Sequence, residues 1–274
     1  MSKYKAKRLA EFFKTVEPFS QHIGDSAADT RSLRILTWNV FLFQFVHDKL
    51  DQLVDIFNRA NADIVCLQEV DAKHPAYKKL LVHLQENGYK HHHFTKSFKE
   101  EGLLTASKYP VEAWAHVYMP GHRCALLAKL SQKNPTCQKI SIVNGHMDCQ
   151  DLTGTMRRSQ LQVLLEFCDI ESTILVGDMN ACHPRYETED SWKRIQKHDQ
   201  DDRNLVTPTL FFDLIHEHGL QSVNSPLTVP VTVWSFRVVD HVVLPKAFFH
   251  GSAAVVKTIL SDHLPVVADI MSHS

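Results

Sequence analysis

Apolar, strand-like runs of this sequence end in acidic or amide side chains at five positions: Asn39, Glu69, Asp178, Asn180 and Asp262. One such acid is more often a cap or a turn residue, but together they indicate a site, because strand ends are where α/β enzymes place chemistry. Carboxylate and amide oxygens are hard ligands that suit Mg²⁺, whereas a zinc site would use several His or Cys. The pattern predicts a Mg²⁺ site, with Mn²⁺ as the alternative ion.

From residue 34 onward, short apolar runs alternate with helix-length amphipathic runs, and these are the elements that must position the site. Strands are expected at 34–40, 64–67, 90–94, 102–107, 112–119, 124–130, 139–146, 173–177, 238–244 and 264–270, and helices at 48–60, 77–86, 155–169 and 209–218. The strands between 90 and 146 suggest an antiparallel meander. We expect one α/β domain over 31–274, a two-layer β-sandwich of mixed sheets flanked by helices, which gives four α/β/β/α layers.

The first 30 residues differ in character from the rest. Residues 1–21 are rich in Lys and place Leu9, Phe12 and Val16 at roughly helical spacing, and residues 24–30 are small and polar. The stretch has no apolar core of a signal peptide. We expect residues 1–30 to form a basic amphipathic helix and a linker, with the helix packed on the domain rather than on a membrane surface.

Charge and cysteine usage exclude several classes of protein. The 274 residues include 30 Lys and Arg against 31 Asp and Glu, a net charge of −1, so no global field attracts a polyanion. The 6 Cys form no CxxC pair, which argues against a zinc ribbon or a disulfide scaffold and favours a reducing compartment. Since no apolar run approaches the roughly 20 residues that span a bilayer, we expect an intracellular monomer of cytoplasm or nucleus without a transmembrane segment.

Seven short motifs in the right order and strand context resemble the endonuclease/exonuclease/phosphatase superfamily of metal-dependent phosphodiesterases. The resemblance covers about residues 33–270. Its motifs are Thr37-Trp38-Asn39, Leu67-Gln68-Glu69-Val70, residues 102–110 (GLLTASKYP), Asn144-Gly145-His146, Gly177-Asp178-Met179-Asn180, Val239-Asp240-His241 and Ser261-Asp262-His263.

The resemblance implies a role for each acidic and amide position. Glu69 would hold the metal, with Asn39 beside it and Asp262 near the same ion. Asp178 would place or deprotonate the attacking water, and Asn180 would donate to a phosphoryl oxygen. These assignments suit a phosphodiester transition state, in which a divalent ion and hydrogen-bond donors offset the charge that develops on the oxygens.

The histidines complete the implied site. His263 would contact the phosphate or serve as general base, and His146 would be a second donor. Asp240 would orient the imidazole of His263 and raise its basicity, provided that the last two predicted strands are neighbours. Of the two adjacent arginines on the helix after the His146 loop, we take Arg158 as a substrate-binding residue.

The loops carry what little the sequence says about substrate. The residues after the first two motifs, such as 40–43 and Val70, are closest to the tyrosyl-DNA phosphodiesterase, deadenylase and sphingomyelinase branches. The insert 184–207 mixes both signs of charge, which argues against a dedicated DNA clamp, and we expect a surface helix and loop beside the site. A nucleic-acid substrate is preferred, a sphingomyelin-like phospholipid is the alternative, and a catalytically silent binding module is the alternative of another class.

Overall fold

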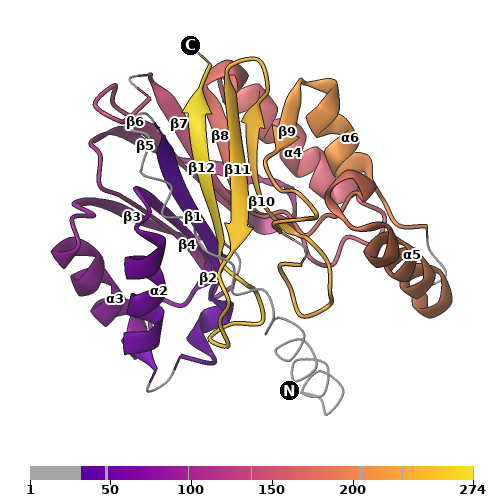
Figure 1. The fold of residues 1–274 in the computed structure, drawn as a ribbon, viewed down its shortest axis with the longest axis horizontal. Helices are drawn as coiled ribbons and strands as arrows, with labels where there is room; N and C mark the ends of the chain where they lie inside the picture. The colour runs from indigo at the N-terminus through magenta and orange to yellow at the C-terminus, as the bar shows by residue number, and fades with distance from the viewer. Residues whose placement is uncertain are drawn as a thin grey trace.

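Two β-sheets packed face to face form the centre of the molecule (Figure 1). The computed structural model describes residues 32–46, 49–97, 99–136, 138–203, 206–229 and 231–273. The helix and linker predicted for residues 1–30 lie outside the described residues. Sheet A has the strand order β11-β12-β1-β2-β4-β3, with β1 Leu33–Asn39, β2 Ile64–Val70, β3 His91–Lys96, β4 Gly102–Ser107, β11 Phe249–Val255 and β12 Val266–Ser272.

Sheet B has the order β5-β6-β7-β8-β10-β9, with β5 Val111–Met119, β6 Arg123–Leu130, β7 Ile140–His146, β8 Thr173–Asp178, β9 Leu220–Ser222 and β10 Asp240–Pro245. The helices are α2 Leu50–Ala60, α3 Pro75–Glu86, α4 Thr155–Phe167, α5 Glu189–Arg203 and α6 Leu210–Glu217, with short 3-10 turns at Phe41–Phe43, Pro120–His122, Ile170–Ser172 and Pro184–Tyr186. Helices α2 and α3 cover the outer face of sheet A, and α4 and α6 cover that of sheet B (Figure 1).

The central strands are apolar on both faces because both faces are buried. In β1, Leu33 and Ile35 belong to the core between the sheets, whereas Leu36 and Trp38 pack in the cluster beneath α2 and α3. Each such fully buried large side chain stabilises the fold by roughly 1.5–3 kcal/mol. The continuous apolar runs of the sequence are thus the pattern of strands covered on two sides.

The same alternation of side chains explains where the polar residues point. Positions on the inner, sheet-facing side of the central strands are mostly apolar and become polar toward one end of the sandwich, where they include Asn39, Gln68, His146, Asp178 and Asp240. Since residues two apart share a face, these side chains enter the space between the sheets at one end of the sandwich. The polar ends of five strands therefore converge.

The four-layer α/β/β/α architecture expected from the sequence is confirmed, but the arrangement of the strands differs in detail. The strands between 90 and 146 do not form one meander: β3 and β4 pair in sheet A, whereas β5, β6 and β7 pair in sheet B. Two strands, β9 and β11, were not expected. Among the described residues, no helix has the length and apolar composition needed to cross a bilayer.

A polar network crosses between the two sheets just beneath the convergent strand ends. Asn144 of β7 is fully buried, and its Nδ2 lies 3.2 Å from Leu67 O and 3.1 Å from Leu104 O in sheet A. Its Oδ1 accepts a hydrogen bond of 2.8 Å from Gln68 Nε2. One amide therefore satisfies polar groups of two strands in the opposite sheet, where no water can replace it.

Replacing Asn144 by Leu is expected to destabilise the protein by roughly 3 kcal/mol, because it leaves several buried polar groups without partners. The free energy of unfolding, measured by urea denaturation, checks this. The matched control is Asn58→Leu, which removes an exposed amide on α2 and should change stability little. Equal stability of the two variants would show that the network does not hold the sheets together.

Candidate active site

An unusual backbone conformation aims Glu69 into the site. In a regular strand, Glu69 would share the outer face of β2 with Leu67, beneath the helices. Instead its φ is 49°, and the pairing of β2 with β4 shifts register between Leu67 and Val70. A positive φ is costly for a residue with a side chain, and such strain persists only where the surrounding structure enforces it. The result is a glutamate directed toward the cavity beyond the strand ends.

Asn39 joins acids of the two sheets. It is fully buried at the end of β1, next to β2 in a parallel pair. Its Nδ2 donates to Glu69 Oε1 at 2.8 Å and to Asp178 Oδ2 at 3.0 Å. Because the amide donates to both carboxylates, it holds them close together although they come from opposite sheets.

Three strands of sheet B bring His146, Asp178 and Asp240 side by side. His146 is opposite Asp178 in the parallel pair β7–β8, and Asp240 is opposite Asp178 in the antiparallel pair β8–β10. Asn180 follows with a φ of 47°, and its backbone N–H donates to Asp178 Oδ1 at 2.9 Å. Its side chain lines the same cavity, although its Nδ2 also donates to Met147 O at 3.2 Å.

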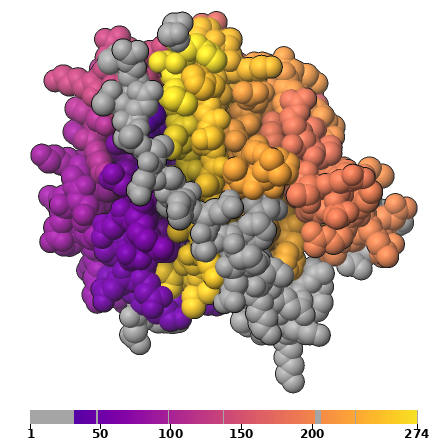
Figure 2. All heavy atoms as spheres, in the orientation of Figure 1, coloured from indigo at the N-terminus to yellow at the C-terminus, as the bar shows by residue number. Residues whose placement is uncertain are grey.

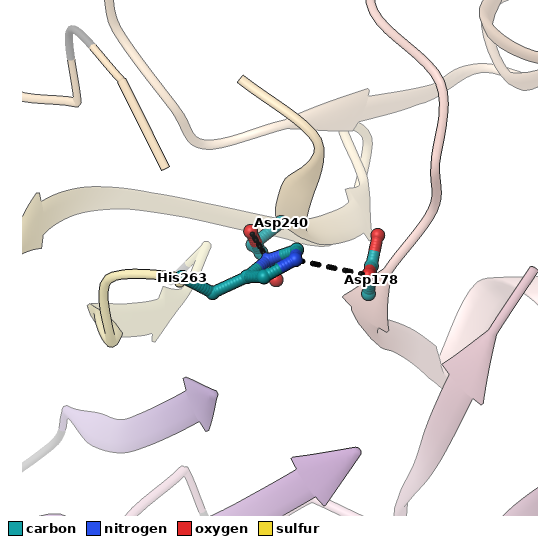
Figure 3. Close-up of side chains that lie close together, drawn as sticks. All are labelled: Asp178, Asp240 and His263. Carbon is teal, nitrogen blue, oxygen red and sulfur yellow. Dashed lines mark hydrogen bonds and ion pairs between the residues drawn. The ribbon is translucent and has the colours of Figure 1, made fainter. Parts of the chain in front are cut away.

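His263 and Asp240 form a close pair in the site (Figure 3). Nδ1 of His263 is 2.8 Å from Asp240 Oδ2, and its Nε2 is 3.8 Å from Asp178 Oδ2. The expected condition for this pair was wrong: strands β10 and β12 are not neighbours but belong to different sheets. The pair forms because the loop before β12 runs beside the loop before β10, where His263 makes an isolated bridge with Val233.

Burial and charge set the protonation of this cluster. Burial raises the pKa of Glu69 to about 7, although the hydrogen bond from Asn39 opposes the shift. Burial and the charge of Asp240 raise the pKa of Asp178. Burial disfavours the imidazolium of His263, but the charges of Asp240 and Asp178 outweigh it and raise the pKa of His263 to about 10. The cluster thus pairs a cationic imidazole with two acids, whereas burial disfavours the charged form of Glu69 more than Asn39 and His263 favour it.

His146 is held as a neutral hydrogen-bond donor by residues that the sequence did not reveal. Arg123 Nη1 lies 3.3 Å from His146 Nδ1 and 2.8 Å from Glu101 Oε2. Burial and the charge of Arg123 lower the pKa of His146 well below its usual 6.5. Because a guanidinium only donates, Nδ1 must accept and the ring hydrogen sits on Nε2. That nitrogen is 3.8 Å from Glu69 Oε1 and 3.7 Å from Asp178 Oδ2.

These side chains line one side of a cavity of about 560 Å³. Asp262 is 3 % exposed and lines the cavity with Glu69, His146, Asp178, Asn180 and His263. The other side of the cavity is formed by Phe41, by Trp234 and Phe236 of the loop before β10, and by residues of α5. The surface helix expected in the insert 184–207 is confirmed as α5. It projects from the body as the coral lobe at the right of Figure 2.

Hydrogen bonds at two points fix α5 to the loop before β10. Ser191 Oγ donates to Glu187 Oε2 at 2.7 Å and to Phe236 O at 3.2 Å. Further along the helix, Arg237 Nη2 donates to Asp199 Oδ1 at 2.6 Å. The helix is therefore a fixed wall of the cavity.

The structure does not bring Arg158 to this cavity. Its guanidinium lies 3.8 Å from Glu217 of α6, where the two side chains form a partly exposed ion pair on the helical layer. The neighbouring Arg157 lines the cavity and is only 6 % exposed. One step along α4 rotates a side chain by about 100°, and the sequence alone did not show which arginine faces inward.

Comparison with known proteins agrees with this fold. The Endonuclease/Exonuclease/phosphatase family model matches residues 36–263. No curated protein sequence matches the chain significantly. The chain is similar to a solved endonuclease/exonuclease/phosphatase from Beutenbergia cavernae, with 20 % identity, a TM-score of 0.66, and coverage of 89 % of this chain and 72 % of that one.

Two further solved structures share the fold. For the catalytic domain of human Nocturnin with bound sulfate, identity is 19 %, the TM-score is 0.65, and coverage is 89 % of this chain and 94 % of that one. For ANGEL2, a 2′,3′-cyclic phosphatase in complex with adenosine-2′,3′-vanadate, identity is 16 %, the TM-score is 0.63, and coverage is 88 % of this chain and 96 % of that one. The family model spans most of the chain, and the chain therefore belongs to the endonuclease/exonuclease/phosphatase family, whose members are hydrolases of phosphoester bonds.

Proposed function

We propose that this protein is a Mg²⁺-dependent phosphodiesterase that hydrolyses a phosphodiester of a nucleic acid by in-line attack of water. The observation that supports it is the convergence of Asn39, Glu69 and Asp178 with the Asp240–His263 pair at one end of the sandwich. Both sheets contribute to this site, and the cavity of about 560 Å³ opens directly beside it.

The donor set fits a hard divalent cation. Glu69 and Asp262 line the cavity with carboxylate oxygens, and Mn²⁺ would suit them as well. Asn39, the third predicted ligand, turns its Nδ2 to Glu69 and Asp178 while its Oδ1 accepts from Phe41 N–H at 3.0 Å, so it would position Glu69 rather than offer an oxygen to the ion. The pKa of Glu69 is raised to about 7 because burial outweighs the hydrogen bond from Asn39 and the charge of His263, so a bound cation would stabilise its carboxylate. Asp178, Asp240 and His263 also approach within 4.8 Å of one another, but the imidazolium of His263 already balances charge there. When bound, the ion would supply electrostatic stabilisation of the phosphoryl oxygens.

The remaining side chains would activate the attacking water and bind the phosphate. The raised pKa of Asp178 makes its carboxylate a base strong enough to take a proton from the attacking water. The Nε2–H of His146 points between Glu69 and Asp178, where a phosphoryl oxygen would accept it. Asn180, next to Asp178, would be a second donor, and these fixed donors need no reorientation as charge develops.

His263 is better suited to bind the phosphate than to remove a proton. Its Nδ1 is tied to Asp240 and its Nε2 is directed toward Asp178, so the ring presents one N–H to the cavity. As a cation, it would donate to a non-bridging phosphoryl oxygen. Asp240, which is fully buried, orients the ring and balances its charge.

Aromatic walls favour a nucleotide over a lipid headgroup. Phe41, Trp234 and Phe236 line the cavity, and nucleobases stack on such side chains. The structurally similar ANGEL2 holds adenosine-2′,3′-vanadate, a nucleoside ligand. We therefore place a nucleic acid before a sphingomyelin-like phospholipid as the substrate class.

A hydrolysis screen in Mg²⁺, Mn²⁺ or EDTA tests the proposal. The substrates are single- and double-stranded DNA, RNA, a 5′-tyrosyl oligonucleotide and sphingomyelin vesicles. We expect cleavage of a nucleic-acid substrate in either metal and none in EDTA. Cleavage of sphingomyelin alone would select the lipid alternative, and a folded protein that binds no metal would support the silent module instead.

A further inference from the structure

Arg157 is a buried cation of the cavity wall with an unused donor. It lies in the first turns of α4 and is 6 % exposed, yet it lines the same cavity as Asp178 and His263. Its Nε is buried and, among the described residues, has no hydrogen-bond partner. A buried guanidinium N–H without an acceptor is rare in a native fold and calls for a ligand.

The rest of the side chain is held in place. Arg157 Nη1 donates to Asp148 O at 3.0 Å, and its backbone N–H donates to Asp151 Oδ2 at 2.9 Å. Burial lowers the pKa of Arg157, while the charges of Asp151, Asp148 and Asp178 oppose that shift. Nη1 is thus fixed to Asp148, whereas Nε is fully buried and has no acceptor at the cavity wall that Arg157 lines, and a small shift of the side chain on ligand binding would bring Nε to an acceptor.

The other arginines of the cavity are differently placed. Arg237 is bound to Asp199 of α5, at 2.6 Å. Arg194 is exposed on α5 and lies over the ring of Phe236, 6.0 Å from its centroid. Arg157 is therefore the arginine of this cavity that combines deep burial with an unsatisfied donor, within the part of the chain that the structure describes.

We infer that Arg157 binds a second phosphate group of the substrate, next to the phosphate that is hydrolysed. The inference rests on the proposed function for the location of the scissile phosphate. An arginine edge engages phosphate oxygens through two parallel N–H donors, which makes phosphate the fitting anion. Because α5 lines the same cavity as Arg157, we expect this site to suit a short or terminal phosphorylated group rather than the middle of a long duplex.

Binding measurements test this without relying on turnover. The probes are thymidine 5′-monophosphate, thymidine 5′-diphosphate and thymidine 3′,5′-bisphosphate, titrated into the full chain in Ca²⁺ by calorimetry. We expect at least one of the two-phosphate ligands to bind about tenfold more tightly than the monophosphate. Arg157→Gln should remove that preference, while Arg157→Lys, which retains charge but not Nε, should retain only part of it.

Two further variants make the test specific. Arg59→Gln removes an exposed arginine of α2 that pairs with Asp55, and it should retain the full preference. Arg158→Gln tests the neighbouring arginine and should also retain it. Equal affinity of the wild type for all three ligands would overturn the inference, as would a preference that survives Arg157→Gln or disappears in Arg158→Gln.

Folding and function are separated in the same experiment. Circular dichroism tests whether each variant is folded. If Arg157→Gln is unfolded, the binding measurement on Arg157→Lys tests the inference in its place. Full retention of the preference for two phosphates in Arg157→Lys would overturn the inference. Preference for two phosphates without hydrolysis of any phosphodiester would uphold Arg157 and contradict the proposed function. Hydrolysis of a phosphodiester without a preference for two phosphates would support the proposed function and contradict the role of Arg157.

Discussion

Replacing Glu69 by Gln is expected to lower metal-dependent turnover roughly a thousandfold, equivalent to about 4 kcal/mol of transition-state stabilisation. The amide keeps the size of the side chain and can still accept the hydrogen bond from Asn39. What it removes is the negative charge that we propose binds the metal. Turnover in saturating Mg²⁺, together with metal affinity from calorimetry, measures the effect.

The same change should leave stability intact or increase it when no metal is present. Burial raises the pKa of Glu69 from 4.5 to about 7, so the folded state resists an ionisation that the unfolded chain undergoes freely. Stability from this residue therefore decreases as pH rises from about 4.5 toward 7, and Gln removes that loss. Glu112→Gln, on an exposed part of β5, is the matched control. Near-normal turnover in Glu69→Gln would mean that the metal is bound elsewhere.

Replacing Asp240 by Asn is expected to reduce kcat about a hundredfold to a thousandfold. The neutral amide would not balance the charge of the imidazolium, so His263 would lose its cationic form. An amide can also either donate to or accept from Nδ1, so it would no longer fix the orientation of the His263 ring. Because His263 would donate to a phosphoryl oxygen whose negative charge grows in the transition state, kcat should fall more than KM rises. Steady-state kinetics on the substrate identified in the hydrolysis screen measure both constants.

A double-mutant cycle separates this pairing from a general loss of structure. His263→Ala alone should reduce kcat at least as much as Asp240→Asn, and the double variant should be no worse than His263→Ala. Such non-additivity is expected of two residues that work as a unit. Additive losses would show that Asp240 contributes independently of His263.

Sequence periodicity predicted most of the fold because it records burial on both faces of each strand. The runs ending at Asn39 and Asp178 are mostly apolar on both faces, as is typical of strands between a sheet and a helical layer. Motif order then indicated which strand ends belong together. Strand β9 was missed because Leu220–Ser222 is too short to show a period.

Other parts of the site depend on contacts that no local pattern encodes. Asp240 and His263 meet across two sheets, which neither strand signals by itself. The turn of Glu69 into the cavity depends on a single positive φ, and the sequence around it reads as an ordinary strand. Likewise, Arg123 shows its role only once β6 lies beside β7 and places it against His146. The roles assigned to these side chains remain predictions until the variants are measured.

The origin of the site from both sheets has a practical consequence for finding the substrate. Glu69 comes from sheet A and Asp178 comes from sheet B, and both line the cavity, so a ligand that contacts both connects the two halves of the sandwich. Any ligand that binds only the folded state raises the melting temperature in proportion to the logarithm of its concentration over its Kd. A thermal-shift survey of nucleotides and headgroup analogues can therefore rank ligands of this protein before any reaction has been observed.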